Sequence, residues 1–283
     1  MDSPAAIDLE LRVLGPADAP PLLLLHGGPG APRSLAPLPE DLARDFEVYE
    51  PSQRGRGDGP LTVDAHVADH LRLRQRIVDA RGVEPAIVGH SWGAMLALVI
   101  AAATPGGFAC VALVGCGTFD RASRAEYKRR FAAATDPALA ARFAAVDDDP
   151  TLDEDERLRR SALLLDPIYA VDPILPAVIP RCDARANRES WADMIRLQEG
   201  GVYPDGFAAI DAPVRMFHGD DDPHPGGMIF ASLRPLVRDL ALESWPRCGH
   251  EPWRERAARE AFLSGLRGFV RAHARPPAAP RSQ

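Results

Sequence analysis

Short apolar runs alternate along the chain with longer segments in which apolar residues recur at helical spacing. Apolar runs of four or five residues that glycine or proline ends are typical of strands buried on both faces of a parallel sheet. The run Leu22-Leu23-Leu24-Leu25 is the clearest of these, and we expect it to form a central strand. The other segments that predict strands are 9–13, at an edge, and 46–50, 86–88, 111–114, 214–217 and 240–244.

Helical segments are predicted between these runs. Thr62 is a suitable N-cap and Gly82 a suitable C-terminal stop, so residues 63–81 are predicted to form a helix. The run 94–103 predicts a buried helix, and the segment 255–273 predicts an amphipathic one. Strands that alternate with helices favour an α/β fold with a mostly parallel, doubly wound sheet.

The pattern changes between residues 118 and 205, where charge runs, prolines and helical spacing replace the strands. We therefore predict a helical lid over 118–205. It is inserted between two parts of an α/β core, residues 1–117 and 206–274. The Pro- and Ala-rich tail, 275–283, is predicted to be disordered.

Composition narrows the class of partner. The chain has 283 residues, of which 46% are hydrophobic and 26% charged, as in a globular domain with its own core. The net charge of −7 and the lack of a basic stripe argue against nucleic acid as a partner. The longest apolar run is shorter than the ~18 residues that a membrane span needs, and residues 1–4 have no signal-peptide character. We therefore expect no membrane association, and the sequence is silent on oligomeric state.

The four cysteines bear on the cellular compartment. Cys110, Cys116, Cys182 and Cys248 are scattered and show no C-x-x-C spacing. This distribution favours buried free thiols over disulfides or a zinc site. We therefore expect a cytoplasmic protein.

The segment Gly89-His90-Ser91-Trp92-Gly93 has the pattern G-x-S-x-G between a predicted strand and a predicted helix. This pattern marks a nucleophile elbow, a strained turn that exposes a serine hydroxyl. Glycine at both ends lets the strand and the helix approach closely. Ser91 is therefore the candidate nucleophile, and His90 is expected to pack on the other face of the strand.

A nucleophilic serine needs a base within hydrogen-bond reach, and the base needs an acid that fixes its tautomer. His250 is the best candidate base among eight histidines, because its loop lies between the last predicted strand and the last predicted helix. In hydrolases whose serine lies on such an elbow, the order along the sequence is serine, acid, histidine, so we expect the acid between Ser91 and His250. A loop that follows a predicted strand there carries Asp220, Asp221 and Asp222.

Four motifs occur in order: His26-Gly27-Gly28-Pro29-Gly30, Gln53-Arg54-Gly55-x-Gly57, Gly89-x-Ser91-Trp92-Gly93 and Gly249-His250-x-Pro252-Trp253. With these motifs the chain resembles the α/β-hydrolases, and among them the proline iminopeptidase branch. Ser52 and Gly59 depart from that branch, which has an aspartate and a serine there. The resemblance covers the two core segments and fades in the lid. It implies the fold and serine hydrolase chemistry more than it implies a substrate.

The resemblance also implies which aspartate belongs to the triad. The acid falls third after the glycine that ends the strand, which is Asp222. Asp221 and then Asp220 are the alternatives. The candidate triad is therefore Ser91, His250 and Asp222.

The oxyanion of a tetrahedral intermediate needs backbone donors. In this fold one donor belongs to the residue after the nucleophile, Trp92, and the other to a loop after an early strand. Gly28 is our candidate for the second donor, because glycine lets the backbone approach a substrate. His26 is expected to hydrogen-bond within its loop, and Arg54 to brace its own loop rather than bind substrate.

Two further readings concern ligands. His218 and His224 beside the aspartates admit a metal site, but the triad already explains this loop, and we expect no metal and no cofactor. Proline iminopeptidases hold a substrate amino group with lid carboxylates. Glu189, Asp193 and Glu199 are candidates for that role, but the lid signature of the branch is not found, and the alternative that each is an exposed helix residue is favoured.

These features predict a hydrolase that cleaves a small acyl substrate, an ester, lactone or amide, with proline iminopeptidase-like activity as one form. The expected partner is a small molecule or a short peptide. A carbon–carbon bond hydrolase or an acyltransferase on the same triad is the first alternative. A non-catalytic binding protein on this scaffold is the second.

Overall fold

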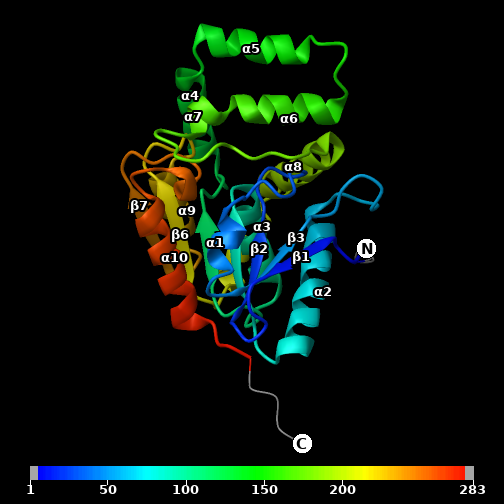
Figure 1. Ribbon diagram of the computed structural model, residues 1–283, viewed down its shortest axis with the longest axis vertical. Coiled ribbons are helices and arrows are strands. Elements are labelled where there is room, and N and C mark those ends of the chain that lie inside the picture. Colours follow the sequence, from blue (N-terminus) through cyan, green and yellow to red (C-terminus); the bar gives the residue numbers. More distant parts are fainter. Residues whose placement is uncertain (1–5, 278–283) are drawn as a thin grey trace, which may run out of the picture.

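The structure is a computed structural model that describes residues 6–277. Residues 1–4, which the signal-peptide prediction concerns, and the end of the predicted tail lie outside the described residues. A seven-stranded sheet forms the centre, with helices on both faces (Figure 1). In pairing order the strands are β1 (Leu11–Leu14), β3 (Glu47–Pro51), β2 (Pro21–Leu25), β4 (Ala86–His90), β5 (Val111–Val114), β6 (Val214–Gly219) and β7 (Leu240–Trp245).

All neighbouring strands are parallel except β1, which pairs antiparallel with β3 at the edge. Strand β2 lies between β3 and β4 and is buried at all five positions. The predictions of a mostly parallel, doubly wound sheet and of a central strand at this run are confirmed. Because parallel strands end at one edge of a sheet, the loops after β2, β4, β6 and β7 gather there.

Helices cover both faces of the sheet: α1 (Leu38–Leu42), α2 (Val63–Arg81), α3 (Trp92–Ala103), α9 (Gly226–Leu233) and α10 (Arg259–His273). Leu23 and Leu25 of β2 belong to one core, which α2, α3 and α9 cover. Leu22 and Leu24 belong to the other core, which α1 and α10 cover. The alternation along the strand thus produces two buried faces, as a doubly wound sheet requires.

Helix α2 has the predicted bounds because its end signals are local. Thr62 Oγ1 accepts from the Ala65 backbone N–H at 3.2 Å, and Gly82 adopts a left-handed φ of 70°. Helix α10 begins at Arg259, four residues later than predicted, because Glu255 forms a β-bridge with Pro173 and residues 256–258 form a turn. The sequence analysis did not predict α1 or α9.

Between β5 and β6 the described chain forms helices α4 (Arg121–Ala134), α5 (Pro137–Asp147), α6 (Glu154–Leu164), α7 (Asp166–Tyr169) and α8 (Ala184–Glu199), followed by a 3-10 turn. An aspartate caps each of four of them, accepting a backbone N–H three residues on. Figure 1 shows α5 farthest from the sheet, α6 below it, and α8 between α6 and the core. The exact borders of core and lid stay a prediction.

No helix within residues 6–277 has both the length and the apolar character to cross a bilayer. All four cysteines are free thiols, and three of them are buried.

Candidate active site

Ser91 lies in a strained turn between β4 and α3. Its φ of 54° and ψ of −118° are sparsely populated for a non-glycine residue, at a cost of order 1–3 kcal/mol. A Cβ on Gly89 would lie 2.1 Å from the Gly93 carbonyl oxygen, and a Cβ on Gly93 would lie 2.4 Å from the Leu25 carbonyl oxygen. Only glycine fits at both positions, so the start of α3 packs against the ends of β4 and β2.

The loop after β2 lies directly beside Ser91. A Cβ on Gly27 would lie 3.1 Å from Ser91 Cβ and 2.9 Å from His90 Nδ1. Gly28 follows with a φ of 34°, and a Cβ there would meet nothing closer than 3.9 Å. In the described part of the chain, neither the Gly28 nor the Trp92 backbone N–H has a hydrogen-bond acceptor. Both amides are therefore available as donors near the serine.

Gln53 ties this loop to the elbow. Its side-chain N–H donates to the His26 carbonyl oxygen at 2.8 Å, and its side-chain oxygen accepts from Trp92 Nε1 at 2.8 Å. The Gln53 backbone N–H donates to His26 Nε2 at 3.2 Å, and His26 Nδ1 donates to the Gly27 carbonyl oxygen at 3.0 Å. Burial lowers the pKa of His26 to about 4. The His26 imidazole is therefore neutral, and its predicted hydrogen bond within the loop is confirmed.

His250 and Asp222, from the loops after β7 and β6, meet at the same edge. His250 Nδ1 donates to Asp222 Oδ2 at 2.7 Å, and both side chains are buried. Burial by itself lowers the pKa of His250, but the Asp222 charge and this hydrogen bond raise it above its ordinary value. Burial by itself raises the pKa of Asp222, but the charges of His250, His224 and His218 hold it well below its usual range. His250 is therefore a stronger base than a free imidazole, and Asp222 stays ionised.

Burial and contacts distinguish Asp222 from its two neighbours. Asp222 is completely buried, whereas Asp220 and Asp221 are exposed. Asp222 Oδ1 accepts from the His224 backbone N–H at 2.8 Å and from His224 Nδ1 at 3.0 Å. Asp222 Oδ2 also lies 3.2 Å from His218 Nε2. Of the three candidate acids, Asp222 is the one whose carboxylate contacts His250.

Sequence reasoning missed Tyr169 and Tyr127, the two tyrosines that pack around the His250 and His224 rings. The Tyr169 carbonyl, at the end of α7, accepts the His250 backbone N–H at 2.7 Å, and the two rings pack with centroids 4.6 Å apart. His224 stacks on His250 at 4.7 Å, and Tyr127 of α4 stacks on His224 at 4.3 Å. The hydroxyl oxygens of Tyr127 and Tyr169 lie 3.1 Å apart. No local pattern marks these residues, because their contacts join distant segments.

Two further residues fix the histidine loop. Glu255 is completely buried and accepts the backbone N–H groups of residues 171 and 172, both at 2.8 Å, and of Gly249 at 3.1 Å. His90 Nε2 donates to the His250 carbonyl oxygen at 3.3 Å, and the two rings lie 4.7 Å apart. Burial lowers the pKa of His90 well below its ordinary value. His90 is therefore a neutral residue that packs against His250, but it also lines the cavity beside Ser91, so the expectation that it lies only on the other face of the strand is wrong.

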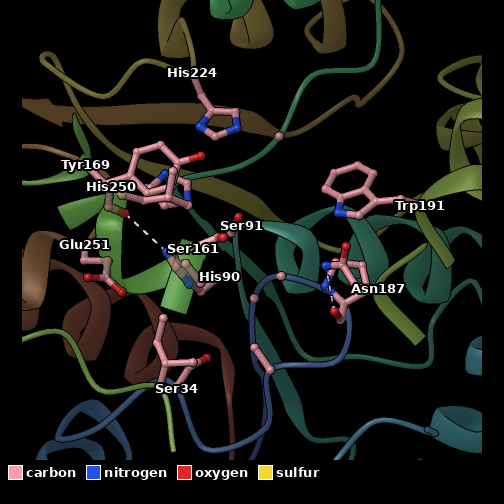
Figure 2. Close-up of a pocket in the computed structure, with 18 of the residues that line it drawn as sticks. Ser34, His90, Ser91, Ser161, Tyr169, Asn187, Trp191, His224, His250 and Glu251 are labelled. Atoms are coloured by element: carbon pink, nitrogen blue, oxygen red, sulfur yellow. Dashed lines mark hydrogen bonds between the residues drawn. The ribbon is translucent and has the colours of Figure 1, made fainter. Parts of the chain in front are cut away.

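Ser91 and His250 line a single cavity of about 500 Å³, which the lid helices and the loop after β2 also line. Figure 2 shows Ser91 in the middle of this space, with His250 and Tyr169 on one side and Trp191 and Asn187 on the other. No hydrogen bond joins the Ser91 side chain to His250 in this structure of residues 6–277. Catalytic hydrogen bonds are often longer before substrate enters and tighten in the complex.

Two arginines near the site are held in ion pairs. Arg254 lines the cavity and pairs with both acids of its wall, Asp166, at 2.6 Å, and Glu251. Arg54 lies outside the cavity lining and donates to both carboxylate oxygens of Asp69 at 2.6 Å. Arg54 therefore braces its loop, and the two cavity acids share the single guanidinium of Arg254.

The three lid acids considered for an amino group do not line the cavity. Glu189 pairs with Arg185 at 2.8 Å, and Asp193 pairs with Arg196 at 2.7 Å while accepting the backbone N–H of residue 63. Glu199 ends α8 at the surface. The structure thus does not bring these carboxylates to Ser91.

Asp222, His224 and His250 also form a group whose potential ligand atoms lie within 4.8 Å of one another. Nδ1 of each imidazole already donates to the carboxylate of Asp222. The Asp222 carboxylate is thus already hydrogen-bonded to both imidazoles. The expectation that no metal binds here stays a prediction.

A seven-stranded sheet, an elbow at the end of β4 and loops that converge beside it are features of one class, the α/β-hydrolases. The model of the alpha/beta hydrolase fold family matches residues 20–223, and the chain belongs to this family.

Solved structures with the same fold include enzymes of different kinds. A proline iminopeptidase from Mycobacterium smegmatis is 22% identical, with a TM-score of 0.62 over 93% of this chain and 94% of that one. An esterase from a Rhodococcus species is 21% identical, with a TM-score of 0.60 over 93% and 94%. An E-2-(acetamidomethylene)succinate hydrolase is 19% identical, with a TM-score of 0.61 over 93% and 95%. At these identities the similarity establishes the fold.

Proposed function

We propose that the protein is a serine hydrolase that cleaves a small acyl ester through an acyl-enzyme. One observation supports this most strongly: the buried 2.7 Å hydrogen bond between His250 and Asp222 borders the same cavity as a serine in a strained elbow. A serine hydroxyl, an imidazole and a carboxylate are the groups that nucleophilic acyl transfer requires.

In the proposed mechanism His250 takes the proton of the Ser91 hydroxyl as its oxygen attacks the substrate carbonyl. The backbone N–H groups of Gly28 and Trp92 stabilise the oxyanion, and one such donor lowers the barrier by about 3 kcal/mol. Asp222 keeps the imidazole proton on Nδ1 and stabilises the imidazolium. His250 then protonates the leaving group and activates the water that releases the acyl group.

We favour esters and lactones over aminopeptidase substrates. Binding a free amino group calls for an unpaired carboxylate near the serine. The two acids of the cavity wall, Asp166 and Glu251, are both paired with Arg254. The free thiols support our further proposal that the protein acts on small molecules in a reducing cytoplasm.

Hydrolysis of 4-nitrophenyl esters and of amino-acyl 4-nitroanilides tests this function. We expect turnover of short-chain aryl esters, with Ser91→Ala reducing kcat at least 1,000-fold, on the order found for loss of a triad member. Ser264→Ala, an exposed serine on α10, is the matched control and retains activity. Equal turnover by the Ser91→Ala protein contradicts the mechanism, and a preference for the anilides contradicts the substrate class.

A further inference from the structure

Lys128 of α4 is the only lysine in the chain. Lys128 is one of the residues that line the cavity containing Ser91, and it is also exposed to solvent. Within the described residues, no ion pair or hydrogen bond engages its ammonium group. Arg124, four residues earlier, lines the same cavity, and its guanidinium donates to the neutral side-chain oxygen of Gln198. Because residues at i and i+4 share a helix face, α4 presents two cations without a counter-charge to the cavity.

This face of α4 lies close to the proposed triad. Tyr127, next to Lys128, stacks on His224 at 4.3 Å, and His224 stacks on His250 at 4.7 Å. Arg130, on the following turn, donates to the carbonyl oxygen of Asp222 at 3.2 Å. Two independent contacts therefore fix α4 against the loop that carries the acid.

The cavity wall also carries two acids that share one arginine, so together they leave a net charge of −1. Arg254 pairs with Asp166 and Glu251, so these three side chains offer no unpaired positive charge. Among the residues that the structure describes, the two cations of α4 have no acidic partner, so their field attracts an anion to this side of the cavity. A lysine on a flexible stem, beside an arginine, suits an anion whose position varies between substrates.

We propose that Lys128 and Arg124 form an anion site, and that the substrate is an ester with a carboxylate away from the scissile carbonyl. This assignment rests on the proposed function, because the ester is cleaved in the same cavity. The carboxylate belongs either to the acyl chain or to the leaving group.

Two matched pairs of esters test the assignment and distinguish these sources. The first pair is the 4-nitrophenyl hemiester of glutaric acid and its neutral methyl ester. The second is 4-acetoxybenzoic acid and its methyl ester. For at least one pair we expect kcat/KM about tenfold higher for the anion, which corresponds to about 1.4 kcal/mol. The ratio of kcat/KM for the anion to kcat/KM for its methyl ester falls as the salt concentration rises, because salt screens the attraction between the carboxylate and the two cations.

Variants of α4 show whether this ratio comes from the anion site. Lys128→Met lowers the ratio toward one, with Arg124 alone still favouring the anion, and Lys128→Arg retains it. Lys128→Glu reverses the preference. Arg129→Met is the matched control, because Arg129 lies outside the cavity lining and pairs with Glu126. A ratio of about one in the wild type, or an unchanged ratio in Lys128→Met, overturns the proposal.

A binding measurement separates this inference from the proposed function. Because Lys128 is the only lysine, acetylation of its ε-amino group in the Ser91→Ala protein is read by peptide mass spectrometry. We expect the anionic ester of at least one of the two pairs, but not the corresponding methyl ester, to slow this acetylation at least threefold. If the wild type hydrolyses no ester, the proposed function fails. Protection of Lys128 from acetylation then shows by itself whether Lys128 and Arg124 bind the anion. Absence of protection overturns the anion site.

Discussion

Asp222→Asn is the change whose effect the structure defines most sharply. Asp222 Oδ1 accepts a hydrogen bond from the backbone N–H of His224 at 2.8 Å. A backbone N–H can only donate, so an acceptor must stay at the Oδ1 position. An asparagine therefore places its carbonyl oxygen at the Oδ1 position and its NH2 group at the Oδ2 position. There the NH2 group faces His250 Nδ1, which lies 2.7 Å from Oδ2 in the native protein.

This orientation changes the tautomer of His250. With a donor opposite Nδ1, the imidazole moves its proton to Nε2 and can no longer accept the serine proton. Loss of the triad acid in this way lowers kcat by about 10⁴-fold. That factor corresponds to about 5 kcal/mol of barrier at 1.36 kcal/mol per tenfold.

Hydrolysis of 4-nitrophenyl butyrate at pH 8 measures this effect. Asp221→Asn is the matched control, because the neighbouring carboxylate is exposed and makes no contact with His250 in the described structure. We expect a loss near 10⁴-fold for Asp222→Asn and less than twofold for the control. A loss below tenfold for Asp222→Asn, in a folded protein, refutes the tautomer argument. A large loss in Asp221→Asn contradicts the choice of acid.

Three further outcomes follow from the same contacts. Because Asp222 raises the pKa of His250 and the base must be neutral, kcat/KM falls with decreasing pH through a value above about 6.5, and this limb moves to lower pH in Asp222→Asn. Gly27→Ala adds a Cβ 3.1 Å from Ser91 Cβ, so we expect kcat to fall more than tenfold while the Tm changes by a few degrees at most. Glu255→Gln deprives three backbone N–H groups of a carboxylate, and urea titration should show a loss of about 2–4 kcal/mol in unfolding free energy, whereas no loss contradicts its anchoring role.

The parts of the fold that sequence predicted are those with local signals. The caps Thr62 and Gly82 determine α2 through contacts within one helical turn, so its bounds were predictable. Helix α9 was missed because it begins with Gly226 and Gly227, which have low helix propensity. Ile229 and Leu233 on this helix are completely buried in the core, and tertiary packing of this kind overrides propensity.

The candidate site divides in the same way. Gly89 and Gly93 mark the elbow because the turn itself excludes a side chain, and this requirement is visible in five residues of sequence. The stack of Tyr127 on His224 has no such mark, because it joins the lid to a loop far along the chain. The choice of Asp222 over Asp221 likewise depended on a resemblance, since burial, which separates them, is a property of the fold.

The central claim is that Ser91 is a nucleophile activated by His250. Reaction with a fluorophosphonate, followed by peptide mass spectrometry, measures this directly, because only an activated serine displaces fluoride rapidly. We predict one adduct, on the peptide that contains Ser91, which is absent in Ser91→Ala and forms far more slowly in His250→Ala. Equal labelling of the Ser91→Ala protein, or an adduct elsewhere in the chain, would contradict it.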